Sequence, residues 1–422
     1  MKLCMIGTGY VGLVSGVCFS DLGNTVYCVD KDQSKINKLI NGHIPIYEPG
    51  LEEILKRNLK QKRLIFTTDL KNAVINSDII FICVGTPTKK NSNSANLKYV
   101  FNVANQLNKI IKKYKIVVTK STVPVTTGDK IQNILKNLYR RKLVDIVSNP
   151  EFLREGEAIR DFLYPDRVVV GTESMKANKI LKSLYLPIVK KSSRYFNTSR
   201  RGAEMIKYAS NAFLATKISY INELANLCEK TNVNIKDISI GMGLDQRIGD
   251  RFLRAGPAYG GSCFPKDTRA LVDTANKFKT NLSIVKSVIK SNNLRKSLLT
   301  KKIDIILSKK FSNKIITFLG VTFKPNTDDM REASSIPMIK YLNKKGCKIR
   351  YYDPSGEKKE FKNLSNVKFY KNISSACLKA DLIIIHTEWN DFKFLNFKNL
   401  VKKKRFKIYD LRNIYSVDKM KK

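Results

Sequence analysis

The stretch that decides the fold opens the chain as KLCMIGTGYVG, residues 2–12, and continues in TVYCVD, residues 25–30. The first part has the pattern of a buried strand that runs into a glycine-rich turn. The second is another apolar strand, which closes on Asp30. Strand, turn, helix and strand in this order predict the first unit of a doubly wound parallel sheet, with a turn that cradles the phosphates of a dinucleotide.

The glycines of the turn have separate roles in such a site. Gly7 allows the tight turn, Gly9 lets the backbone approach the pyrophosphate, and Gly12 lets the helix pack against the strand. The helix then points its first amides at the phosphates. The carboxylate of Asp30 suits the ribose hydroxyls of NAD and repels the extra phosphate of NADP. NAD is therefore the predicted cofactor, and Lys35 lies close enough in sequence to reach it.

The rest of the chain divides into three parts by its pattern. Strand-like runs continue through the first third, at residues 78–87 and 115–124. Long helical periodicity fills residues 198–300. The last part returns to strands, and four of them are expected to be parallel: residues 314–320, 347–354, 381–389 and 406–413. We expect domains at residues 1–197, 198–300 and 301–422.

The two strand-rich parts echo each other. Each has a strand that ends in Asp (Asp30 and Asp353) and a strand that opens with Asp (Asp78 and Asp381). The second part lacks the three-glycine turn and has GVTFKPNTDD at residues 320–329 instead. The predicted fold class is therefore α/β, with two doubly wound, Rossmann-like parallel-sheet domains joined by a long central helical region. The first domain is expected to bind a dinucleotide and the second something related.

The formal net charge is +42, from 78 Lys and Arg against 36 Asp and Glu. One interpretation is a nucleic-acid partner. The lysines are scattered through nearly every segment, however, and basic runs such as residues 402–405 are short. No clustered basic and aromatic stripe of the kind that stacks bases is visible. A lysine-rich solvated surface is the favoured interpretation, and positive potential also favours capture of anionic nucleotides.

Residue usage restricts the chemistry and the compartment. The eight cysteines form no CxxC pair, and Cys4, Cys28 and Cys83 lie inside apolar strands. Buried thiols in a reducing cytoplasm are expected. With His43 and His386 as the only histidines, a His-based triad or a His-rich metal site is almost excluded, and no metal is expected. No apolar run reaches the roughly eighteen residues of a membrane span. The N-terminal apolar stretch carries the nucleotide glycines, so it is not interpreted as a signal peptide.

The central part begins with a long helix, expected over residues 200–230. Lys207 and Asn211 are four residues apart, so they share one face of this helix. That face is expected to lie away from an apolar stripe. Lys207 alone has the ordinary interpretation of a solvated surface lysine and the alternative one of a catalytic cation. The stripe consists of Met205, Ala209, Ala212, Phe213 and Thr216.

The segment GPAYGGSCFPKD, residues 256–267, is the most informative for chemistry. Its Gly-Gly pair permits positive φ and a close approach by substrate. Pro265 suits the first turn of a helix, which places Cys263 just before a helix N-terminus, with Lys266 close by. Both neighbours favour the thiolate form. The alternative is a packed structural cysteine, which the flanking glycines and the charged Lys266 and Asp267 make less suitable.

A second polar segment, NPEFLREG at residues 149–156, follows the strand-like VDIVS. Glu151 and Glu155 would then lie at the carboxyl edge of a parallel sheet, where ligands bind. The alternative is a charged loop without a function.

Together these segments resemble the UDP-glucose/GDP-mannose dehydrogenase family, in order and over nearly the whole chain. Ala258 stands where the family often has glycine. The resemblance is carried by GTGYVGL (7–13), IPIYEPGL (44–51), VGTPT (84–88), STVP (121–124), NPEFLREG (149–156), Lys207 with Asn211, GGSCFPKD (260–267) and GVTFKPNTDDMREA (320–333).

The resemblance implies an enzyme that oxidises a nucleotide sugar at C6 by four electrons with two NAD. Residues 149–156 and those that follow look more like the branch that acts on UDP-glucose and makes UDP-glucuronate, a precursor for polysaccharide biosynthesis. Cys263 looks like the nucleophile, which would carry the sugar as a thiohemiacetal and then as a thioester. Lys207 or Asp267 takes the first proton, and the choice stays open.

The resemblance also implies roles for particular residues. The catalytic set would be Cys263, Lys207, Asn211, Asp267, Glu151 and Thr122, in which Lys207 and Asn211 stabilise oxyanions, Asp267 and Thr122 hold a water, and Glu151 is the base for hydrolysis. NAD would be bound by Gly7, Gly9, Tyr10, Val11, Gly12, Asp30, Lys35, Thr86, Thr122, Glu155, Lys266 and Arg331. The UDP-sugar would be bound by Phe152, Leu153, Arg154, Glu155, Lys207, Asn211, Arg247, Phe252, Leu253, Arg254, Ala255, Gly256, Gly260 and Lys324.

A homodimer, or a multiple of it, is implied as well, with the helical middle as the contact and Arg247 reaching across it. Three alternatives stay open. The same chemistry acts on GDP-mannose or a UDP-N-acetylhexosamine; the chain is a non-catalytic, basic nucleic-acid-binding protein; or it is a two-electron dehydrogenase in which Cys263 is structural.

Overall fold

The structure is a computed structural model of the whole chain, and it describes all residues except 91, 190–193, 417, 419 and 421–422. The expected domains 1–197 and 301–422 include some of these positions, which lie outside the described residues. The chain forms two compact units. The first contains Met1–Ser210 and Asp273–Lys279, and the second contains Asn211–Val272 and Thr280–Lys422.

The first unit is built on an eight-stranded sheet in the order β3-β2-β1-β4-β5-β6-β7-β8. Neighbouring strands are parallel except β6 and β7, which pair antiparallel at Ser148 and Gly171. The strands are β1 (Lys2–Ile6), β2 (Thr25–Val29), β3 (Leu64–Thr67), β4 (Ile79–Ile82), β5 (Lys115–Thr119), β6 (Val144–Ser148), β7 (Val168–Gly171) and β8 (Tyr195–Thr198).

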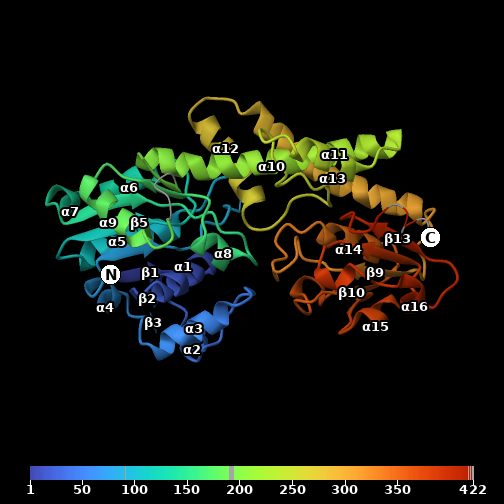
Figure 1. Ribbon diagram of the computed structural model, residues 1–422, viewed down its shortest axis with the longest axis horizontal. Coiled ribbons are helices and arrows are strands. Elements are labelled where there is room, and N and C mark those ends of the chain that lie inside the picture. The colour runs from blue at the N-terminus through green and yellow to red at the C-terminus, as the bar shows by residue number, and fades with distance from the viewer. Residues whose placement is uncertain (91, 190–193, 417, 419, 421–422) are drawn as a thin grey trace. The chain divides into compact units, whose positions relative to one another are not determined.

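Helices cover both faces of this sheet (Figure 1). One core packs α1, α3, α8 and α9 on the sheet, and the other packs α4 to α7 on the opposite face. The strands are apolar nearly throughout, as both-side burial requires. The helices are α1 (Tyr10–Asp21), α2 (Gln33–Ile40), α3 (Leu51–Lys60), α4 (Leu70–Ile75), α5 (Lys98–Ile110), α6 (Thr127–Ile134), α7 (Lys136–Arg140), α8 (Ala158–Leu163) and α9 (Met175–Tyr185).

The second unit contains a five-stranded, fully parallel sheet in the order β11-β10-β9-β12-β13. Helices α13 and α14 pack on one face of it, and α15 and α16 on the other. The strands are β9 (Ile315–Leu319), β10 (Lys348–Tyr352), β11 (Val367–Phe369), β12 (Leu382–Ile385) and β13 (Lys407–Asp410), and the helices are α11 (Ile235–Gly243), α13 (Ser283–Ile306), α14 (Ser335–Lys344), α15 (Ile373–Cys377) and α16 (Phe397–Val401).

Two helices run through both units: α10 (Arg200–Thr231) and α12 (Phe264–Lys277). The predicted fold class is confirmed, since two Rossmann-like parallel sheets occur with a central helical region. Four strands were not predicted, namely β3, β7, β8 and β11. They have three or four residues each, and two of them, β8 and β11, are not fully buried on either face, so their apolar pattern is weak.

The echo between the two sheets extends to individual hydrogen bonds. Asp30 accepts the amide of Thr8, in the turn after β1, at 3.0 Å. Asp353 accepts the amide of Val321, in the turn after β9, at 2.8 Å. The side chains differ in access, because Asp353 is fully buried whereas the side chain of Asp30 is 15% exposed. The first carboxylate can still meet a ligand, and the second serves its own fold.

Lys207 and Asn211 lie on the buried side of α10. They are 4% and 6% exposed, whereas Met205 and Phe213 of the apolar stripe are 42% and 67% exposed. Periodicity shows which residues share a face, but it does not show which face is buried. Here Lys207 and Asn211 are buried with their partners, and Met205 and Phe213 of the apolar stripe are exposed in the single chain.

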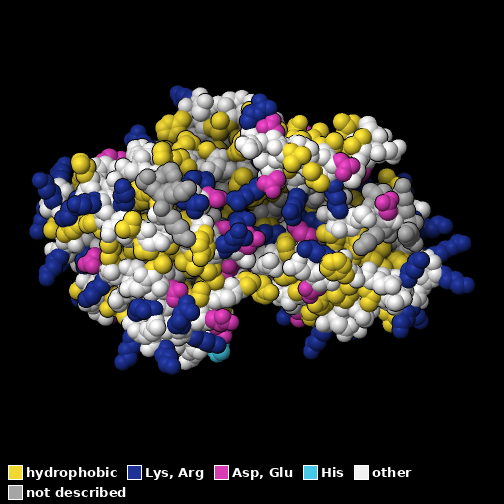
Figure 2. Space-filling view, viewed as in Figure 1, with side chains coloured by type: hydrophobic (Ala, Val, Ile, Leu, Met, Phe, Trp, Pro, Cys, Tyr) yellow, Lys and Arg dark blue, Asp and Glu magenta, His cyan; other side chains and the backbone are white. Residues whose placement is uncertain are grey.

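Charge is distributed broadly. On the face that Figure 2 shows, Lys and Arg side chains are spread over both units and are not gathered in one stripe. No helix in the described part of the chain is long and apolar enough to span a membrane.

Candidate functional site

The glycine turn after β1 has the geometry that a dinucleotide needs. Gly7 has a φ of +100°, a conformation that favours glycine, and a Cβ on Gly12 would lie 1.9 Å from the carbonyl oxygen of Gly7. A Cβ on Gly9 would meet nothing within 4 Å. Gly9 is the N-cap of α1, and no side chain of the described residues caps that helix start. The first amides of α1 therefore face open space, which suits a pyrophosphate.

Asp30 lies directly after β2, beside this turn. Its Oδ2 accepts bonds from the Thr8 hydroxyl at 2.7 Å and from the Lys35 ammonium at 3.0 Å, and its Oδ1 accepts the Asp32 amide. Burial alone would raise the pKa of Asp30, but the bonds from Thr8, Lys35 and Asp32 outweigh it and lower the pKa to about 2. The carboxylate is thus held charged and in place for the ribose hydroxyls. Lys35 reaches the site through Asp30.

The carboxyl ends of β4, β5 and β6 add further polar groups. The Thr86 hydroxyl donates to the Thr122 carbonyl at 2.9 Å, so these two predicted residues lie together. Lys120 is 4% exposed and donates to Asn149 Oδ1 and to the Tyr185 hydroxyl, both at 3.2 Å. Burial lowers the pKa of Lys120 to about 8. Lys120 was not among the residues predicted for the site, and its position directly after β5 was the signal that could have found it.

Lys207 and Glu151 form a buried ion pair. The Lys207 ammonium donates to the Glu151 carbonyl at 2.6 Å and to its Oε1 at 3.2 Å, and the two side chains are 5% and 6% exposed. The Lys207 Nζ also lies 5.2 Å from the centre of the Phe152 ring. Because Lys207 is buried, the interpretation of it as a solvated surface lysine is wrong. Its pairing with Glu151 offsets the cost of burying its charge.

The loop between β6 and α8 carries four predicted ligand residues, all half-buried: Phe152, Leu153, Arg154 and Glu155. The Phe152 ring lies under the Arg167 guanidinium at 4.0 Å. Arg154 pairs with Asp161 at 2.7 Å, within the loop and its helix, so its side chain is used to hold the loop. These contacts hold the loop in a defined conformation, as a binding segment requires.

In the second unit, Cys263 is the residue before α12 and is half-buried. Its Sγ lies 3.5 Å from the Ser262 hydroxyl, and its carbonyl accepts the Asp267 amide at 2.8 Å. Pro265 falls in the first turn of α12, as predicted. The other seven cysteines are all buried, and none of the eight, all of which the structure describes, forms a disulfide.

A hydrogen-bonded polar group includes the residues that follow this cysteine in the chain. It consists of Lys266, Asp267 and, from α10, Asn211. The Asn211 amide donates to Asp267 Oδ2 at 2.6 Å, and the Lys266 ammonium donates to Oδ1. Asp267 is fully buried. Asn211 is one helical turn after Lys207 on α10, so both project from one face of that helix. The structure thus brings Asn211 and Asp267 together in the second unit, and Lys207 and Glu151 in the first.

The Gly-Gly pair before Cys263 faces protein and not open space. Gly261 has a φ of +78°, and a Cβ on it would lie 2.7 Å from the Phe323 ring. A Cβ on Gly260 would lie 2.8 Å from the Glu332 carbonyl oxygen. The Gly261 amide also donates to the Arg331 carbonyl at 2.8 Å. The expected close approach is therefore made by residues 323–332, which fix the cysteine segment against the FKPNTDD loop.

The remaining predicted substrate residues lie in the same unit. The Gly256 amide donates to Asn222 Oδ1 at 2.8 Å, and a Cβ on Gly256 would lie 3.0 Å from the Arg412 guanidinium, a residue that the sequence analysis missed. Leu253 and Ala255 are buried, Phe252 is half-buried, and Arg254 is exposed. Lys324 Nζ lies 5.7 Å from the Phe323 ring. Arg247 is exposed and pairs with Asp245 at 2.6 Å.

Ala258 has a φ of +105°, a region that favours glycine. The departure from the family pattern therefore falls at a backbone position where glycine would be relaxed.

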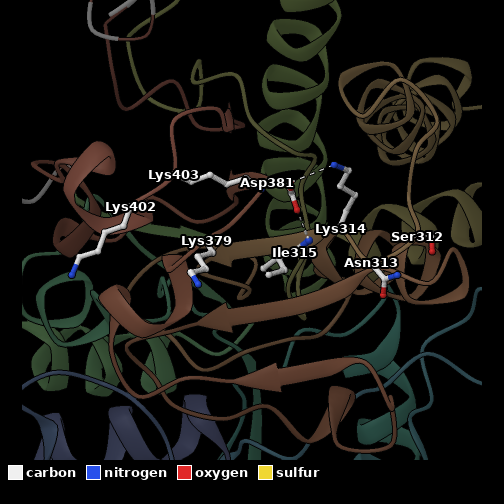
Figure 3. Close-up of a pocket in the computed structure, with 8 residues that line it drawn as sticks. All are labelled: Ser312, Asn313, Lys314, Ile315, Lys379, Asp381, Lys402 and Lys403. Atoms are coloured by element: carbon white, nitrogen blue, oxygen red, sulfur yellow. Dashed lines mark hydrogen bonds and ion pairs between the residues drawn. The ribbon is translucent and has the colours of Figure 1, made fainter.

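A depression of about 530 Å³ in the second unit lies elsewhere (Figure 3). Its residues precede β9, β12 and β13, so it is at the amino edge of the five-stranded sheet. In Figure 3, Lys314 and Lys403 lie on either side of Asp381, and their ammonium groups are 3.4 Å and 2.6 Å from its carboxylate. Ligands of parallel sheets bind at the carboxyl edge. We therefore do not assign the nucleotide sugar to this depression.

Comparison with known proteins now decides the family. Residues 1–189 match the NAD-binding domain of the UDP-glucose/GDP-mannose dehydrogenase family, residues 201–294 its central domain, and residues 317–417 its UDP-binding domain. The chain belongs to the UDP-glucose/GDP-mannose dehydrogenase family. The resemblance found from the sequence is confirmed, and so are membership of an NAD-dependent oxidoreductase family and NAD as its cofactor.

Relatives within this dehydrogenase family are similar over their full lengths. A UDP-glucose 6-dehydrogenase of Rhizobium meliloti is 46% identical, with 100% of this chain and 97% of that protein covered. UDP-glucose 6-dehydrogenase TuaD of Bacillus subtilis is 42% identical, with coverages of 99% and 90%. Among solved structures, a UDP-glucose dehydrogenase from Pyrobaculum islandicum has a TM-score of 0.90 at 34% identity, covering 98% of this chain and 94% of that one.

Proposed function

We propose that this dehydrogenase oxidises UDP-glucose to UDP-glucuronate. The full-length similarity to UDP-glucose 6-dehydrogenases supports the substrate. The observation that carries the chemistry is the position of Cys263: it is half-buried, just before α12, and one turn ahead of an Asp267 held by Asn211 and Lys266. Three domains are proposed, a dinucleotide-binding one (1–197), a helical one (198–300) and a UDP-sugar-binding one (301–422).

The reaction removes four electrons from C6 of the sugar in two steps. NAD, when bound, accepts the hydride of each step. The alcohol first becomes an aldehyde and loses one proton to a base. The Cys263 sulfur then adds to the aldehyde carbon to give a thiohemiacetal, so that the aldehyde is not released. The second oxidation gives a thioester, and water cleaves the C–S bond to release the carboxylate and the thiol.

The buried charges of the chain suit these steps. Oxygen at C6 becomes negative when the alcohol loses its proton and when the thiol or water adds, and the Lys207 ammonium with the Asn211 amide would stabilise it. Glu151 would take the proton of the hydrolytic water, and Thr122 and Asp267 would hold a water that moves protons. The first proton goes to the Asp267 carboxylate, or to Lys207 in its neutral amine form, and the choice stays open. The Lys207 nitrogen lies 3.2 Å from Glu151 Oε1, so it is positioned before substrate binds.

The nicotinamide cofactor fits the first unit on two counts. The uncapped first turn of α1 offers amides to a pyrophosphate, and Asp30 offers a charged carboxylate to the ribose. The residues proposed to hold NAD there are Gly7, Gly9, Tyr10, Val11, Gly12, Asp30, Lys35, Thr86, Thr122 and Glu155. The family resemblance adds Lys266 and Arg331 to the proposed NAD ligands.

The test is an assay of purified protein with NAD and a panel of nucleotide sugars, followed by NADH absorbance and by mass spectrometry of the product. We expect turnover with UDP-glucose and a product of the mass of UDP-glucuronate. Turnover with a UDP-N-acetylhexosamine or GDP-mannose alone would keep the chemistry and replace the substrate. That alternative is motivated by the likeness to a UDP-D-ManNAc dehydrogenase from Pyrococcus horikoshii, with a TM-score of 0.87 at 26% identity, covering 99% of this chain and 96% of that one.

A homodimer that forms through the central helices is also proposed. Large apolar side chains on α10 and directly after α11 are exposed in the single chain, with Phe213 at 67%, Leu227 at 58% and Leu244 at 79%. Exposed apolar side chains of this size are typical of a subunit contact, and Arg247 would reach across it. Phe213→Glu should lower the mass measured by light scattering to that of one chain. An unchanged mass would place the contact elsewhere.

We assign the protein to the cytoplasm because its cysteines are thiols.

A further inference from the structure

A buried carboxylate outside the predicted site joins two parts of it. Glu48 is 4% exposed and lies in the loop between α2 and α3. It accepts four hydrogen bonds. One comes from the Tyr10 hydroxyl, and the others come from the amides of Gly156 at 2.6 Å, Ala158 at 2.8 Å and Ile159 at 3.4 Å. Every partner is a donor, so the bonds suit a carboxylate, which only accepts.

These donors belong to the two segments that are expected to bind ligands. Tyr10 is the first residue of α1, directly after the glycine turn of the dinucleotide site. Gly156 and Ala158 close the loop that carries residues 152–155. The Tyr10 hydroxyl also accepts the Gly156 amide at 2.9 Å. Glu48 and Tyr10 thus form one hydrogen-bonded group that ties the start of α1 to the end of the β6–α8 loop.

The loop has other bonds as well. Glu151 accepts the Leu153 amide at 2.5 Å and the ammonium of Lys207 on α10 at 3.2 Å, and Asp161 of α8 accepts the Arg154 amide at 2.8 Å. These bonds hold the loop to itself, to α10 and to α8, and the Glu48 group adds a tie to the start of α1. Burial and the bond to Glu48 raise the pKa of Tyr10 far above its ordinary range, so the phenol keeps the proton that it donates. The position of the loop against the start of α1 therefore depends in part on Glu48.

We propose that Glu48 is a positioning residue that holds the ligand-binding loop at residues 152–155 in register with the dinucleotide-binding start of α1. This inference rests on the proposed function, because that function makes the loop a binding segment for both cofactor and nucleotide sugar. Loss of the carboxylate leaves the Ala158 amide without its acceptor and the Gly156 amide with the Tyr10 hydroxyl alone, and the loop moves relative to α1. Affinity for NADH and for UDP-glucose then falls together.

Six proteins test the proposal: the wild type, Glu48→Ala, Glu48→Gln, Tyr10→Phe, the double variant Tyr10→Phe with Glu48→Gln, and the control Glu52→Gln. Glu52 is a carboxylate four residues on, and its partner is the exposed Lys56. The measurements are the NADH dissociation constant by fluorescence, the UDP-glucose KM, kcat, the Tm, and hydrogen exchange of the peptide that contains Gly156 and Ala158.

We expect Glu48→Ala to weaken NADH binding and to raise the UDP-glucose KM by about tenfold or more each, the effect of losing bonds to a charged group. Exchange at Gly156 and Ala158 should become faster. Glu48→Gln keeps one acceptor oxygen and should restore part of the affinity, and Glu52→Gln should match the wild type. Tyr10→Phe combined with Glu48→Gln should weaken binding by less than the product of the two single effects, because both variants break the same bond.

A lower Tm with NADH binding and UDP-glucose KM within twofold of the wild type would show a merely structural role and overturn the proposal. If Glu48→Ala does not fold, Glu48→Gln decides by the same measurements. Failure of the proposed function is distinguishable: a wild-type protein that binds NADH but does not oxidise UDP-glucose would refute that function, and the NADH and exchange measurements on Glu48→Gln would still test the positioning role.

Discussion

At the scale of residues, the eight cysteines differ in a way that can be measured. Cys263 is half-buried and the other seven are buried. Burial raises the pKa of Cys83 to about 12 and that of Cys347 to about 11, which leaves little thiolate at neutral pH. An electrophile should therefore distinguish Cys263 from the rest.

We expect iodoacetamide at pH 7.5 to add one label per chain, on Cys263, and to remove activity at the same rate. Intact-mass and peptide mass spectrometry provide the count and the position. Cys263→Ala should take up no label over the same time. Rapid labelling of two or more cysteines, or of one other than Cys263, would contradict the assignment of the reactive thiol.

The residues also show where prediction from sequence ends. The glycines, Asp30 and the Cys263 segment were found because each needs a particular residue type at a particular spacing. Lys207 was left between two interpretations, since no helical pattern reveals that Glu151 lies opposite it. Glu48 and Lys120 were not assigned, because their partners are distant in sequence: Glu48 binds amides 108 to 111 residues away.

At the scale of elements, the contact of α1 with β1 separates two roles of glycine. A Cβ on Gly12 would meet the Gly7 carbonyl at 1.9 Å, so Gly12→Ala must push α1 off the sheet. Gly9 has a φ of −70°, which alanine adopts easily, and a Cβ there would meet no atom within 4 Å.

Gly12→Ala should therefore lower the Tm by several degrees or prevent folding, because a buried clash costs on the order of 1–3 kcal/mol or more. Gly9→Ala should leave the Tm unchanged and weaken NADH binding by about tenfold, because the added methyl occupies space next to the pyrophosphate. Thermal melting and NADH fluorescence are the measurements. Unweakened NADH binding by Gly9→Ala would place the cofactor elsewhere.

The elements were predictable where both faces of a strand are buried, as in β1 and β4, whose runs are apolar except for Lys2. Short strands such as β11 were missed because three residues carry too little pattern. Which side of α10 is buried could not be predicted for a different reason. Lys207 and Asn211 are buried by tertiary partners, and periodicity alone does not distinguish a buried face from an exposed one.

At the scale of the whole molecule, a buried carboxyl makes the stability depend on pH. Glu204 lies on α10, is 2% exposed and accepts the Gly128 amide at 2.7 Å and the Ser148 hydroxyl at 3.1 Å. Burial raises its pKa to about 7, and these bonds offset the rise only in part. Between its ordinary value of 4.5 and about 7, the folded chain binds more protons at Glu204 than the unfolded chain does. Its contribution therefore lowers stability as pH rises through this window.

Glu204→Gln keeps one acceptor oxygen and removes the titration. At pH 8 the wild type bears the full cost of the buried Glu204 charge, up to about 3 kcal/mol. The Tm of the variant minus the Tm of the wild type should therefore be more positive at pH 8 than at pH 5. Differential scanning fluorimetry at both pH values provides the difference, and other titrating groups cancel in it. A difference that is the same at both pH values would show that Glu204 does not titrate in this range.

The central claim is that one active site carries the sugar through two oxidations on Cys263. The measurement that tests it most directly is the number of NADH formed per UDP-glucose consumed, from 340 nm absorbance and chromatography of the nucleotide sugars, for the wild type and Cys263→Ser. We predict a ratio of two for the wild type, and no UDP-glucuronate from the variant. A ratio of one, or normal release of UDP-glucuronate by Cys263→Ser, would contradict the covalent mechanism.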